Sequence, residues 1–267
     1  MDLTSQSKKK VKVAVVDCDC SLPDVECGAG DVCRDACESN GGISGSVEPR
    51  TMWAGIIREK APEAEIYRVP IYDKECGQAL VKAIEQCIDL EMDLVTVGFG
   101  TKEVMSKNEL LDVCRKAVRG GTMLIAAGEV DQEMYPAVFA AVIGVADGRV
   151  DASDGYAYRK HQVIECVVDA QRSFWFNGNR AMRANFAASY MTGFVAQFLQ
   201  NHPNASLQKI RYFLAINSVE ELRRRERLFV APLSAKKGVA RLWWGSDSFK
   251  WVKKRLTLTV HDTKSGG

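Results

Sequence analysis

Short, continuous apolar runs alternate along this chain with segments in which apolar residues recur at helical spacing. The runs 11–17 and 122–128 are short and mostly apolar, and the first, which ends in Asp17, is rich in β-branched residues, as is typical of strands buried in a parallel sheet. Between them, Leu80, Ile84 and Ile88 lie on one face of a predicted helix. This alternation predicts an α/β fold, with a mostly parallel central sheet flanked by helices in three layers.

The hydrophobic pattern also predicts where individual helices and strands begin and end. Asn108 is positioned to cap a helix that ends at Gly120 and Gly121. Residues 151–178 are less regular, with strand-like character at 163–169 and 173–176. The other expected strands are 64–73, 93–100 and 140–146, and the other expected helices are 51–61, 79–92, 183–200 and a shorter one that ends near residue 214.

The expected organisation is one main domain with two flanking segments. Residues 1–10 form a flexible N-terminus, and 11–218 form the α/β domain. Residues 18–48 are rich in Cys, Gly, Asp and Ser without a helical period, which indicates a long loop inside that domain. Residues 219–267 are basic, carry tryptophans, and are expected to pack on the same domain as a C-terminal extension.

Composition narrows the classes of partner. With 46% hydrophobic residues in 267, the chain can bury a full core. The net charge of +2 favours no polyanion, so a nucleic-acid partner is not expected, and the basic runs near the C-terminus are read as a solvated face. No apolar run is long enough to span a bilayer, so no membrane partner is expected. The basic N-terminus lacks the apolar stretch of a secretory signal, which favours a cytoplasmic protein.

Five of the nine cysteines are clustered directly after the first predicted strand. Their spacing, C-x-C-x6-C-x5-C-x3-C, matches no standard metal-binding signature. Four such thiolates can hold Zn or an iron–sulfur cluster, an oxidising compartment would make them disulfides, and they can also remain free thiols. The sequence leaves these alternatives open, so no cofactor is certain. The clustered residues are Cys18, Cys20, Cys27, Cys33 and Cys37.

Six segments, in order and at suitable spacing, resemble the subtilisin-like serine proteases. They cover the chain from about Val11 to Leu214, and the resemblance implies the three-layer subtilisin-like fold. The six segments are VAVVD at 13–17, WAGIIREKAPEAEIYRV at 53–69, DLVTVGFG at 93–100, MLIAAGE at 123–129, YPAVFAAVIGVA at 135–146, and ASYMTGFVAQFLQNHPNAS at 188–206.

The resemblance also implies that the catalytic machinery of this family is degenerate here. The family's aspartate falls on Asp17, but the histidine position holds Pro49 and the serine position holds Asn185. The oxyanion-donor position holds Glu129, whose carboxylate would repel developing negative charge. A prolyl ring accepts no proton and an amide is not a useful nucleophile, so the sequence predicts a pseudoprotease.

A shift of alignment register does not restore the triad. The three histidines are His161, His202 and His261, none of them near residue 49, and His202 falls on a non-catalytic His-Pro of the family. Ser189 is close to Asn185 but lacks the surroundings of the family's nucleophile. A site that uses Cys18 instead would need a partner that lowers the thiol pKa, and His161 is the only candidate.

Peptide binding can outlast catalysis, because strand addition requires only free main-chain groups. Gly98, Phe99 and Gly100 fall where the family pairs with an extended substrate, although the glycines could equally serve only to turn the strand into a loop. Similar short subtilases mature ribosomally made peptides. The resemblance therefore implies a protein that binds a peptide or protein, with an active protease or modifying enzyme as a further candidate partner. An enzyme that uses Asp17, Cys18 or Glu129, and a metal-stabilised scaffold, remain alternatives.

Overall fold

The computed structural model describes residues 10–18, 52–71, 76–102, 106–151, 155–171 and 180–230. The chain divides into two compact units, residues 1–224 and residues 225–267. All strands of the described region belong to the first unit. Of the second unit, only residues 225–230 are described, and they form the end of a helix.

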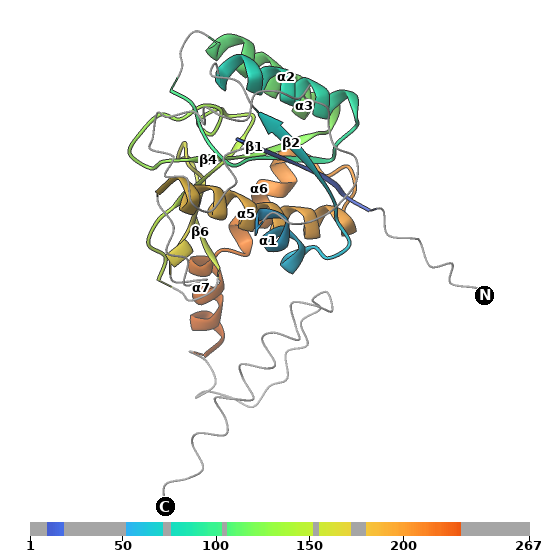
Figure 1. The fold of residues 1–267 in the computed structure, drawn as a ribbon. Coiled ribbons are helices and arrows are strands. Elements are labelled where there is room, and N and C mark those ends of the chain that lie inside the picture. The colour runs from blue at the N-terminus through green and yellow to red at the C-terminus, as the bar shows by residue number, and fades with distance from the viewer. Residues whose placement is uncertain are drawn as a thin grey trace, which may run out of the picture. The chain divides into compact units, whose positions relative to one another are not determined.

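The described part of the first unit contains a seven-stranded sheet with the order β2-β1-β3-β4-β5-β7-β6 (Figure 1). Neighbouring strands are parallel except β6 and β7, which are antiparallel. The strands are β1 (Lys12–Cys18), β2 (Glu65–Ile71), β3 (Leu94–Val97), β4 (Met123–Gly128), β5 (Ile143–Asp147), β6 (Tyr156–Tyr158) and β7 (Cys166–Val168).

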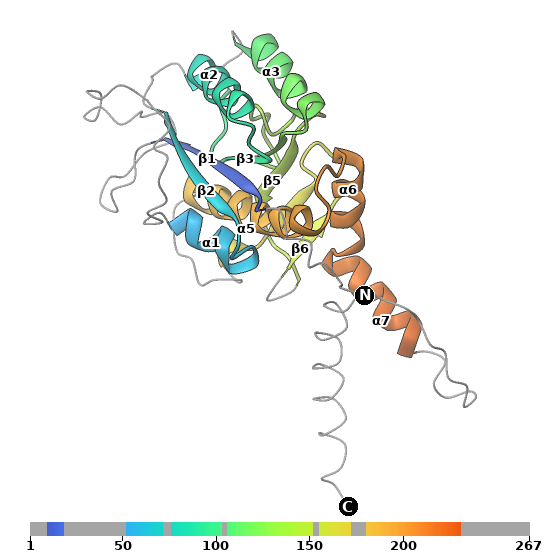
Figure 2. The same cartoon turned by 90° about the vertical axis from the view of Figure 1, so that its right-hand side faces the viewer.

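Helices cover both faces of this sheet (Figure 2), which confirms the expected α/β class with three layers. Helices α2 and α3 pack together on one face, and α1 and α5 pack together on the other. The helices are α1 (Met52–Lys60), α2 (Cys76–Asp89), α3 (Lys107–Gly120), α5 (Arg180–Asn201), α6 (Leu207–Ile216) and α7 (Val219–Val230). Within the described ranges, none of them combines the length and apolar character that crossing a bilayer requires.

Two hydrophobic clusters, one on each face, explain why the strands are continuously apolar. Val13 and Val15 of β1 face the cluster that contains α1 and α5, whereas Ala14 and Val16 face the cluster that contains α2 and α3. All four are at most 3% exposed. Because successive side chains of a strand point to opposite faces, a strand between two helical layers needs apolar residues at every position.

Helix α5 crosses the core, as its small residues predicted. Ala187, Ala188 and Ser189 are fully buried, and α5 packs against α1 and several strands. Thr192 satisfies its buried hydroxyl by donating to the carbonyl of Ala188 at 2.8 Å. A side chain no larger than alanine lets a helix backbone approach a sheet closely, so these positions set how deeply α5 lies.

Three sequence-based expectations about local structure are wrong or incomplete. Asn108 is not a cap, because α3 already begins at Lys107, and Ser106 before it makes no side-chain capping bond. Gly121 does end α3, in the left-handed conformation at φ 97°. Helix α7 and strand β6 had no clear signal in the hydrophobic pattern, since α7 is mostly charged and β6 is short. The strand-like segment 173–176 lies outside the described residues.

The first turns of α7 belong to the main unit. Val219 joins a small apolar cluster with Val150, Ala157 and Val167, and Arg223 pairs with Asp151 at 3.1 Å. The expected extension therefore begins at a helix that is anchored at its start. Its basic, tryptophan-bearing remainder lies outside the described residues, as does the N-terminal segment 1–9, so their expected arrangement stays a prediction.

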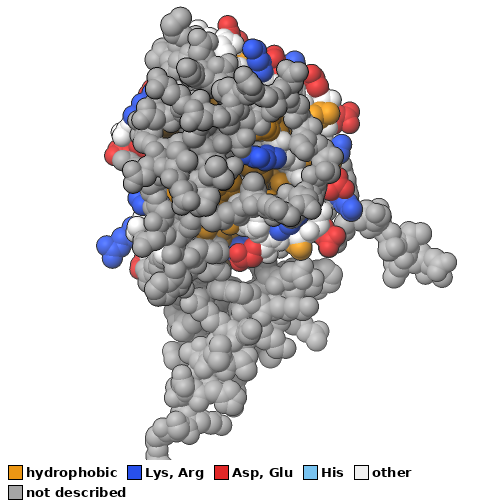
Figure 3. Space-filling view, viewed as in Figure 1, with side chains coloured by type: hydrophobic (Ala, Val, Ile, Leu, Met, Phe, Trp, Pro, Cys, Tyr) orange, Lys and Arg blue, Asp and Glu red, His pale blue; other side chains and the backbone are white. Residues whose placement is uncertain are grey.

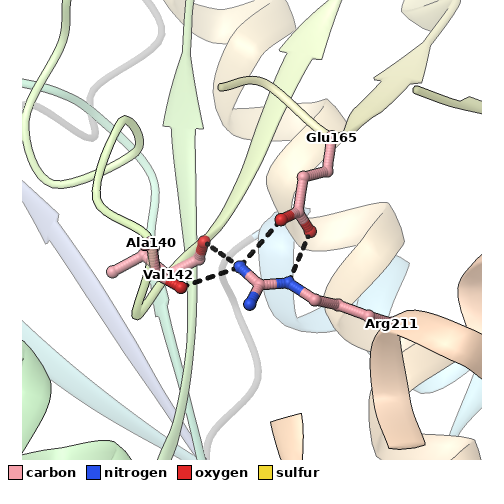
Figure 4. A network of polar contacts seen from close by, with 4 residues as sticks. All are labelled: Ala140, Val142, Glu165 and Arg211. Carbon is pink, nitrogen blue, oxygen red and sulfur yellow. Dashed lines mark hydrogen bonds and ion pairs between the residues drawn. The ribbon is translucent and has the colours of Figure 1, made fainter. Parts of the chain in front are cut away.

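Helix α6 is fastened to the sheet by one guanidinium group (Figure 4). The Nε of Arg211 donates to Glu165 at 3.0 Å, and one Nη lies 2.7 Å from the other Glu165 oxygen. The same Nη donates to the carbonyls of Ala140 and Val142, at 2.9 and 3.4 Å. Burial raises the pKa of Glu165, and Arg211 opposes that rise.

Candidate functional site

The sheet order marks one position, beyond the carboxyl ends of β1 and β3, that we call the crevice. From β1 the chain moves outward to β2, then returns past β1 to β3 and continues through β4 and β5. The direction of winding therefore reverses between β1 and β3. In open α/β sheets, ligands bind at such a reversal, beyond the carboxyl ends of the strands.

Asp17 and Cys18 end β1 at this crevice. Their backbones pair with Pro70 and Ile71 of β2, whereas the pairing of β1 with β3 stops one residue earlier, at Val16 and Val97. The structure thus places Asp17 at the carboxyl end of β1, although the side chains of Asp17 and Cys18 are outside the description. Pro49 and the predicted metal ligands Cys20, Cys27, Cys33 and Cys37 also lie outside the described residues.

Gly98, the first residue after β3, is in direct contact with Asn185 of α5. A Cβ on Gly98 would overlap the carboxamide of Asn185, so only glycine fits below that side chain. The N–H of Gly98 donates to the carbonyl of Val16 at 3.1 Å. Two positions that the sequence assigned to separate roles, the nucleophile position and the peptide-pairing strand, therefore meet in one place.

The polar groups around Asn185 are buried and neutral. Asn185 is 6% exposed and Ser189 is fully buried, and the Ser189 hydroxyl donates to the Asn185 amide oxygen at 3.5 Å. A carboxamide donates and accepts hydrogen bonds but does not attack a carbonyl carbon. The hydroxyl closest in sequence to Asn185 thus faces the protein interior, where no substrate reaches it.

An ion pair that the sequence analysis missed positions the start of α5. Arg183 donates to Asp147 at 2.8 Å, and the other Asp147 oxygen accepts the N–H of Ala170 at 3.1 Å. Asp147 is the last residue of β5, so it joins the sheet edge to the helix turn that carries Asn185. The position of Asp147 at the end of an apolar strand could have marked it as a candidate. Its partners could not be identified, because they are distant in the sequence.

The three residues of the predicted peptide strand have different environments. Phe99 packs its ring against the cluster that contains α2 and α3. Gly100 faces Met134, whose Cβ would lie 2.8 Å from a Cβ added there. Thr101 then pairs with Tyr135 through two main-chain hydrogen bonds, at 2.9 and 2.8 Å. Main-chain bonds therefore hold this segment at both of its ends, from Gly98 to Val16 and between Thr101 and Tyr135.

Glu129 directly follows β4, the neighbour of β3, and is one of the residues that line a pocket. His161 lines the same pocket from the segment before β7. Because β7 is four positions from β1 in the sheet order, the fold does not bring His161 to the end of β1, where Cys18 lies. His202 stacks on Phe198 at 4.3 Å on the surface, in keeping with a non-catalytic role, and His261 is outside the described residues.

The three described cysteines with resolved side chains belong to the core. Cys87, Cys114 and Cys166 are fully buried free thiols. Burial raises the pKa of Cys87 and of Cys114 to about 12, and raises that of Cys166 well above its usual value. Among the described residues, no group of three or more histidine, cysteine or acidic side chains is arranged to hold a metal ion.

These thiols give a direct test of the packing. In the native protein, Cys87, Cys114 and Cys166 are expected to resist iodoacetamide at pH 8, because the reactive thiolate is both inaccessible and disfavoured. Peptide mass spectrometry after a timed reaction measures this, with the denatured protein as the control that labels fully. Alkylation of any of the three at the rate of the denatured chain would contradict the packing described.

The charged side chains on the surface of the described residues are mixed in sign. On the face drawn in Figure 3, acidic and basic side chains of the described region both appear along the rim, while hydrophobic side chains gather nearer the middle. This mixture agrees with the near-balanced net charge of the chain.

Comparison with known proteins gives structural likenesses alone. No protein-family model matches the chain, and no curated protein matches it. Among solved structures, a lanthipeptide protease is 14% identical with a TM-score of 0.46, and the alignment covers 76% of this chain and 78% of that one. Sphericase is 14% identical with a TM-score of 0.45, covering 79% and 85%.

A third likeness is to the epidermin leader peptide processing protease from Staphylococcus aureus. It is 12% identical with a TM-score of 0.45, covering 76% of this chain and 69% of that one. At these identities and TM-scores the likenesses assign neither a family nor an activity to this chain. Its α/β class rests on its own sheet order and layers.

Proposed function

We propose that this chain is a subtilisin-like protein without peptidase activity that holds an extended peptide in the crevice between β1 and β3. Its role would be in the maturation of a ribosomally made peptide in the cytoplasm, beside an active protease or modifying enzyme. Neither a nucleic acid nor a membrane takes part. The proposal rests on the resemblance of the six segments and on the main-chain geometry of residues 98–101.

That geometry is the observation that carries the proposal. Both main-chain groups of Thr101 bond to Tyr135, in the segment that follows β4 in the chain. Because successive residues of an extended chain direct these groups to opposite edges, the N–H and C=O of Gly100 point to the β1 side. The N–H of Gly98 points the same way, toward Val16. Gly100 would therefore present its donor and acceptor to the crevice, three residues beyond Val97, where the pairing of β3 with β1 ends.

The proposed lack of hydrolysis follows from the side chains at the crevice. The position expected to hold the nucleophile is the buried amide of Asn185, and Ser189 beside it is fully buried. Without a hydroxyl at that position, attack on a peptide bound along Gly100 has no nucleophile. Peptide binding needs none of these groups, because the main chain supplies its hydrogen bonds.

One observation favours a second candidate, an enzyme that uses Asp17 or Cys18. Both residues end β1 at the same crevice, so a thiol there would lie beside a peptide bound at Gly100. If the protein cleaves peptides and Cys18→Ser abolishes that cleavage, the chain is an enzyme, and the proposal that it lacks peptidase activity is wrong. The metal-stabilised scaffold is tested separately by elemental analysis, in which stoichiometric zinc or iron would support it.

Binding is tested with a library of leader-like peptides measured by calorimetry, followed by N-methylation of each backbone nitrogen of the best ligand. We expect N-methylation to weaken binding at alternate positions near the centre of the peptide by about tenfold, since only every second N–H faces Gly100. The ligand is altered rather than Phe99, because the Phe99 ring packs in the core. No binding by any peptide, or equal loss at every position, would reject the proposal.

A further inference from the structure

Thr96 of β3 carries a buried hydroxyl that has no hydrogen-bond partner among the residues that the structure describes. The residue is only 1% exposed, so bulk solvent does not reach the hydroxyl either. A hydroxyl loses its bonds to water when it is buried, and buried polar groups in folded proteins therefore almost always have a partner. The surroundings of Thr96 indicate what that partner is.

The side chain of Thr96 points to the face of the sheet that α5 covers. Leu94, two residues earlier in β3, belongs to the cluster that contains α1 and α5. A Cβ on Gly98, two residues later, would overlap Asn185 of α5. Because side chains of a strand alternate between faces, Thr96 points the same way as both. Its hydroxyl thus lies between β3 and α5, about 7 Å along the strand from Gly98.

Helix α5 runs in the opposite direction to β3. Asn185, near the start of α5, lies over Gly98 beyond the carboxyl end of β3. Further along α5, a Cβ on Gly193 would lie 3.1 Å from the side chain of Lys60, the last residue of α1. The chain passes from α1 into the amino end of β2, so Lys60 marks the amino edge of the parallel strands. Each turn of α5 after Asn185 therefore lies further back along β3.

Ser189 is the residue of α5 that this geometry brings level with Thr96. It follows Asn185 by four positions, so it lies on the same face of the helix and about 6 Å further along it. Ser189 is fully buried, and its hydroxyl donates to Asn185 at 3.5 Å, which is long for a bond between two oxygens. No direct hydrogen bond joins this hydroxyl to that of Thr96, although both residues are described.

We propose that one buried water molecule bridges Thr96 and Ser189. The Thr96 hydroxyl donates to the water oxygen, and the water donates to the Ser189 oxygen, which keeps its own proton for Asn185. Two polar partners are enough to hold an internal water, and such a bridge is nearly as favourable as a direct bond. Ala188 and Ser189 let α5 approach the sheet closely here, so a larger ligand is not expected.

The bridge would tie α5 to β3 one helical turn behind the contact between Asn185 and Gly98. It therefore belongs to the support of the crevice rather than to its surface. The inference does not depend on peptide binding, because it concerns groups that are buried in the chain on its own.

Thr96→Val tests the site, because valine has nearly the shape of threonine but no hydroxyl. If the hydroxyl holds a water, its removal leaves that water with one partner fewer, and the melting temperature Tm is expected to fall by about 2–6 °C. If the hydroxyl has no partner, valine removes a buried polar group that makes no bond, and the Tm stays the same or rises. Calorimetry of the full-length variant distinguishes the two, and an equal or higher Tm overturns the inference.

A second variant links the effect to Ser189. Since one water serves both hydroxyls, Thr96→Val with Ser189→Ala is expected to lower the Tm by at least about 2 °C less than the sum of the two single changes. Thr192→Val is the matched control, because the Thr192 hydroxyl donates to the carbonyl of Ala188 in its own helix. Its effect should add to that of Ser189→Ala within about 1 °C. Additive effects of Thr96→Val and Ser189→Ala overturn the inference.

The native protein provides a test that does not require the variants to fold. A high-resolution crystal structure of the full-length chain is expected to show a water about 2.8 Å from the hydroxyl oxygens of both Thr96 and Ser189. Density for a direct bond between the two hydroxyls, or an empty position between them, overturns the inference.

Discussion

Replacing Arg211 by methionine is expected to lower the free energy of unfolding at pH 7 by about 2–3 kcal/mol. The substitution keeps much of the apolar stem but removes the charge that Glu165 and two loop carbonyls share (Figure 4). Glu165 is only 13% exposed, so its carboxylate would stay buried without a partner. The expected loss is at the low end for buried pairs because a quarter of the Arg211 side chain is open to solvent.

The loss is expected to depend on pH in a defined direction. Burial raises the pKa of Glu165 in the folded protein above its ordinary value, and Arg211 holds that rise in check. A carboxyl whose pKa is higher when folded binds more protons in the folded state, so stability falls as pH rises from the unfolded pKa through the folded one. Without Arg211 this fall becomes larger, and Arg211→Met should regain stability as the pH is lowered toward that of the unfolded carboxyl.

Chemical denaturation at several pH values measures both effects. Adding Glu165→Gln to Arg211→Met is expected to recover part of the loss at pH 7 and to remove the added pH dependence, because no buried charge remains. Lys209→Met, an exposed change on the same helix, controls for the loss of a positive charge from α6. If Arg211→Met proves as stable as Lys209→Met, the guanidinium does not fasten α6 as described.

The elements that could be predicted from the sequence are those whose signal is local. Strands β1 and β4 are continuous apolar runs, and α5 is long, apolar and rich in small residues, so each was located within a few positions. Burial on both faces of the sheet makes such runs unambiguous. Where local signals conflict, the prediction was wrong: Asn108 is a good cap by type, yet α3 begins before it.

The contacts that hold the site could not be predicted, because they join residues far apart in the chain. Arg183 and Asp147 are separated by 36 positions, and Arg211 and Glu165 by 46. Charged pairs of this kind have no periodicity, and a chain with 36 basic and 34 acidic residues offers many combinations. The pocket that Glu129 and His161 line is formed by two segments that are distant in the sequence, and the hydrophobic pattern did not predict it.

Two of the predicted site positions are in contact in the fold, although nothing in the sequence pattern predicted this contact. Resemblance placed Asn185 and Gly98 in different motifs, and the fold brings the two into contact. The glycines at 98 and 100 were both expected where a peptide backbone could approach. The structure distinguishes their surroundings, because a Cβ on Gly98 would overlap the Asn185 carboxamide, whereas a Cβ on Gly100 would meet Met134.

Because of this contact, Gly98→Ala is expected to lower the free energy of unfolding, whereas a glycine-to-alanine substitution at an open position raises it. Gly98→Ala would normally stabilise a chain by about 0.4–1 kcal/mol, because alanine restricts the unfolded state. Here the added methyl group overlaps the carboxamide of Asn185. Asn185 belongs to α5, whose small buried residues keep that helix close to the sheet. Overpacking of this kind costs about 1–3 kcal/mol, so Gly98→Ala is expected to be clearly destabilising. Thermal and denaturant unfolding of the variant measures the sign.

A double-mutant cycle assigns the effect to this contact. Asn185→Ala alone is expected to cost about 1–3 kcal/mol, because it empties a buried site and removes the acceptor of the Ser189 hydroxyl. In Gly98→Ala with Asn185→Ala the methyl group occupies space that the amide has left, so the two costs should fall short of additivity by about 1 kcal/mol or more. Gly120→Ala, where an added Cβ meets nothing within 4 Å, is the matched control and should not be rescued by Asn185→Ala. Additive costs at Gly98 and Asn185 would show that the amide does not lie over Gly98, and the position of α5 over the crevice would need revision.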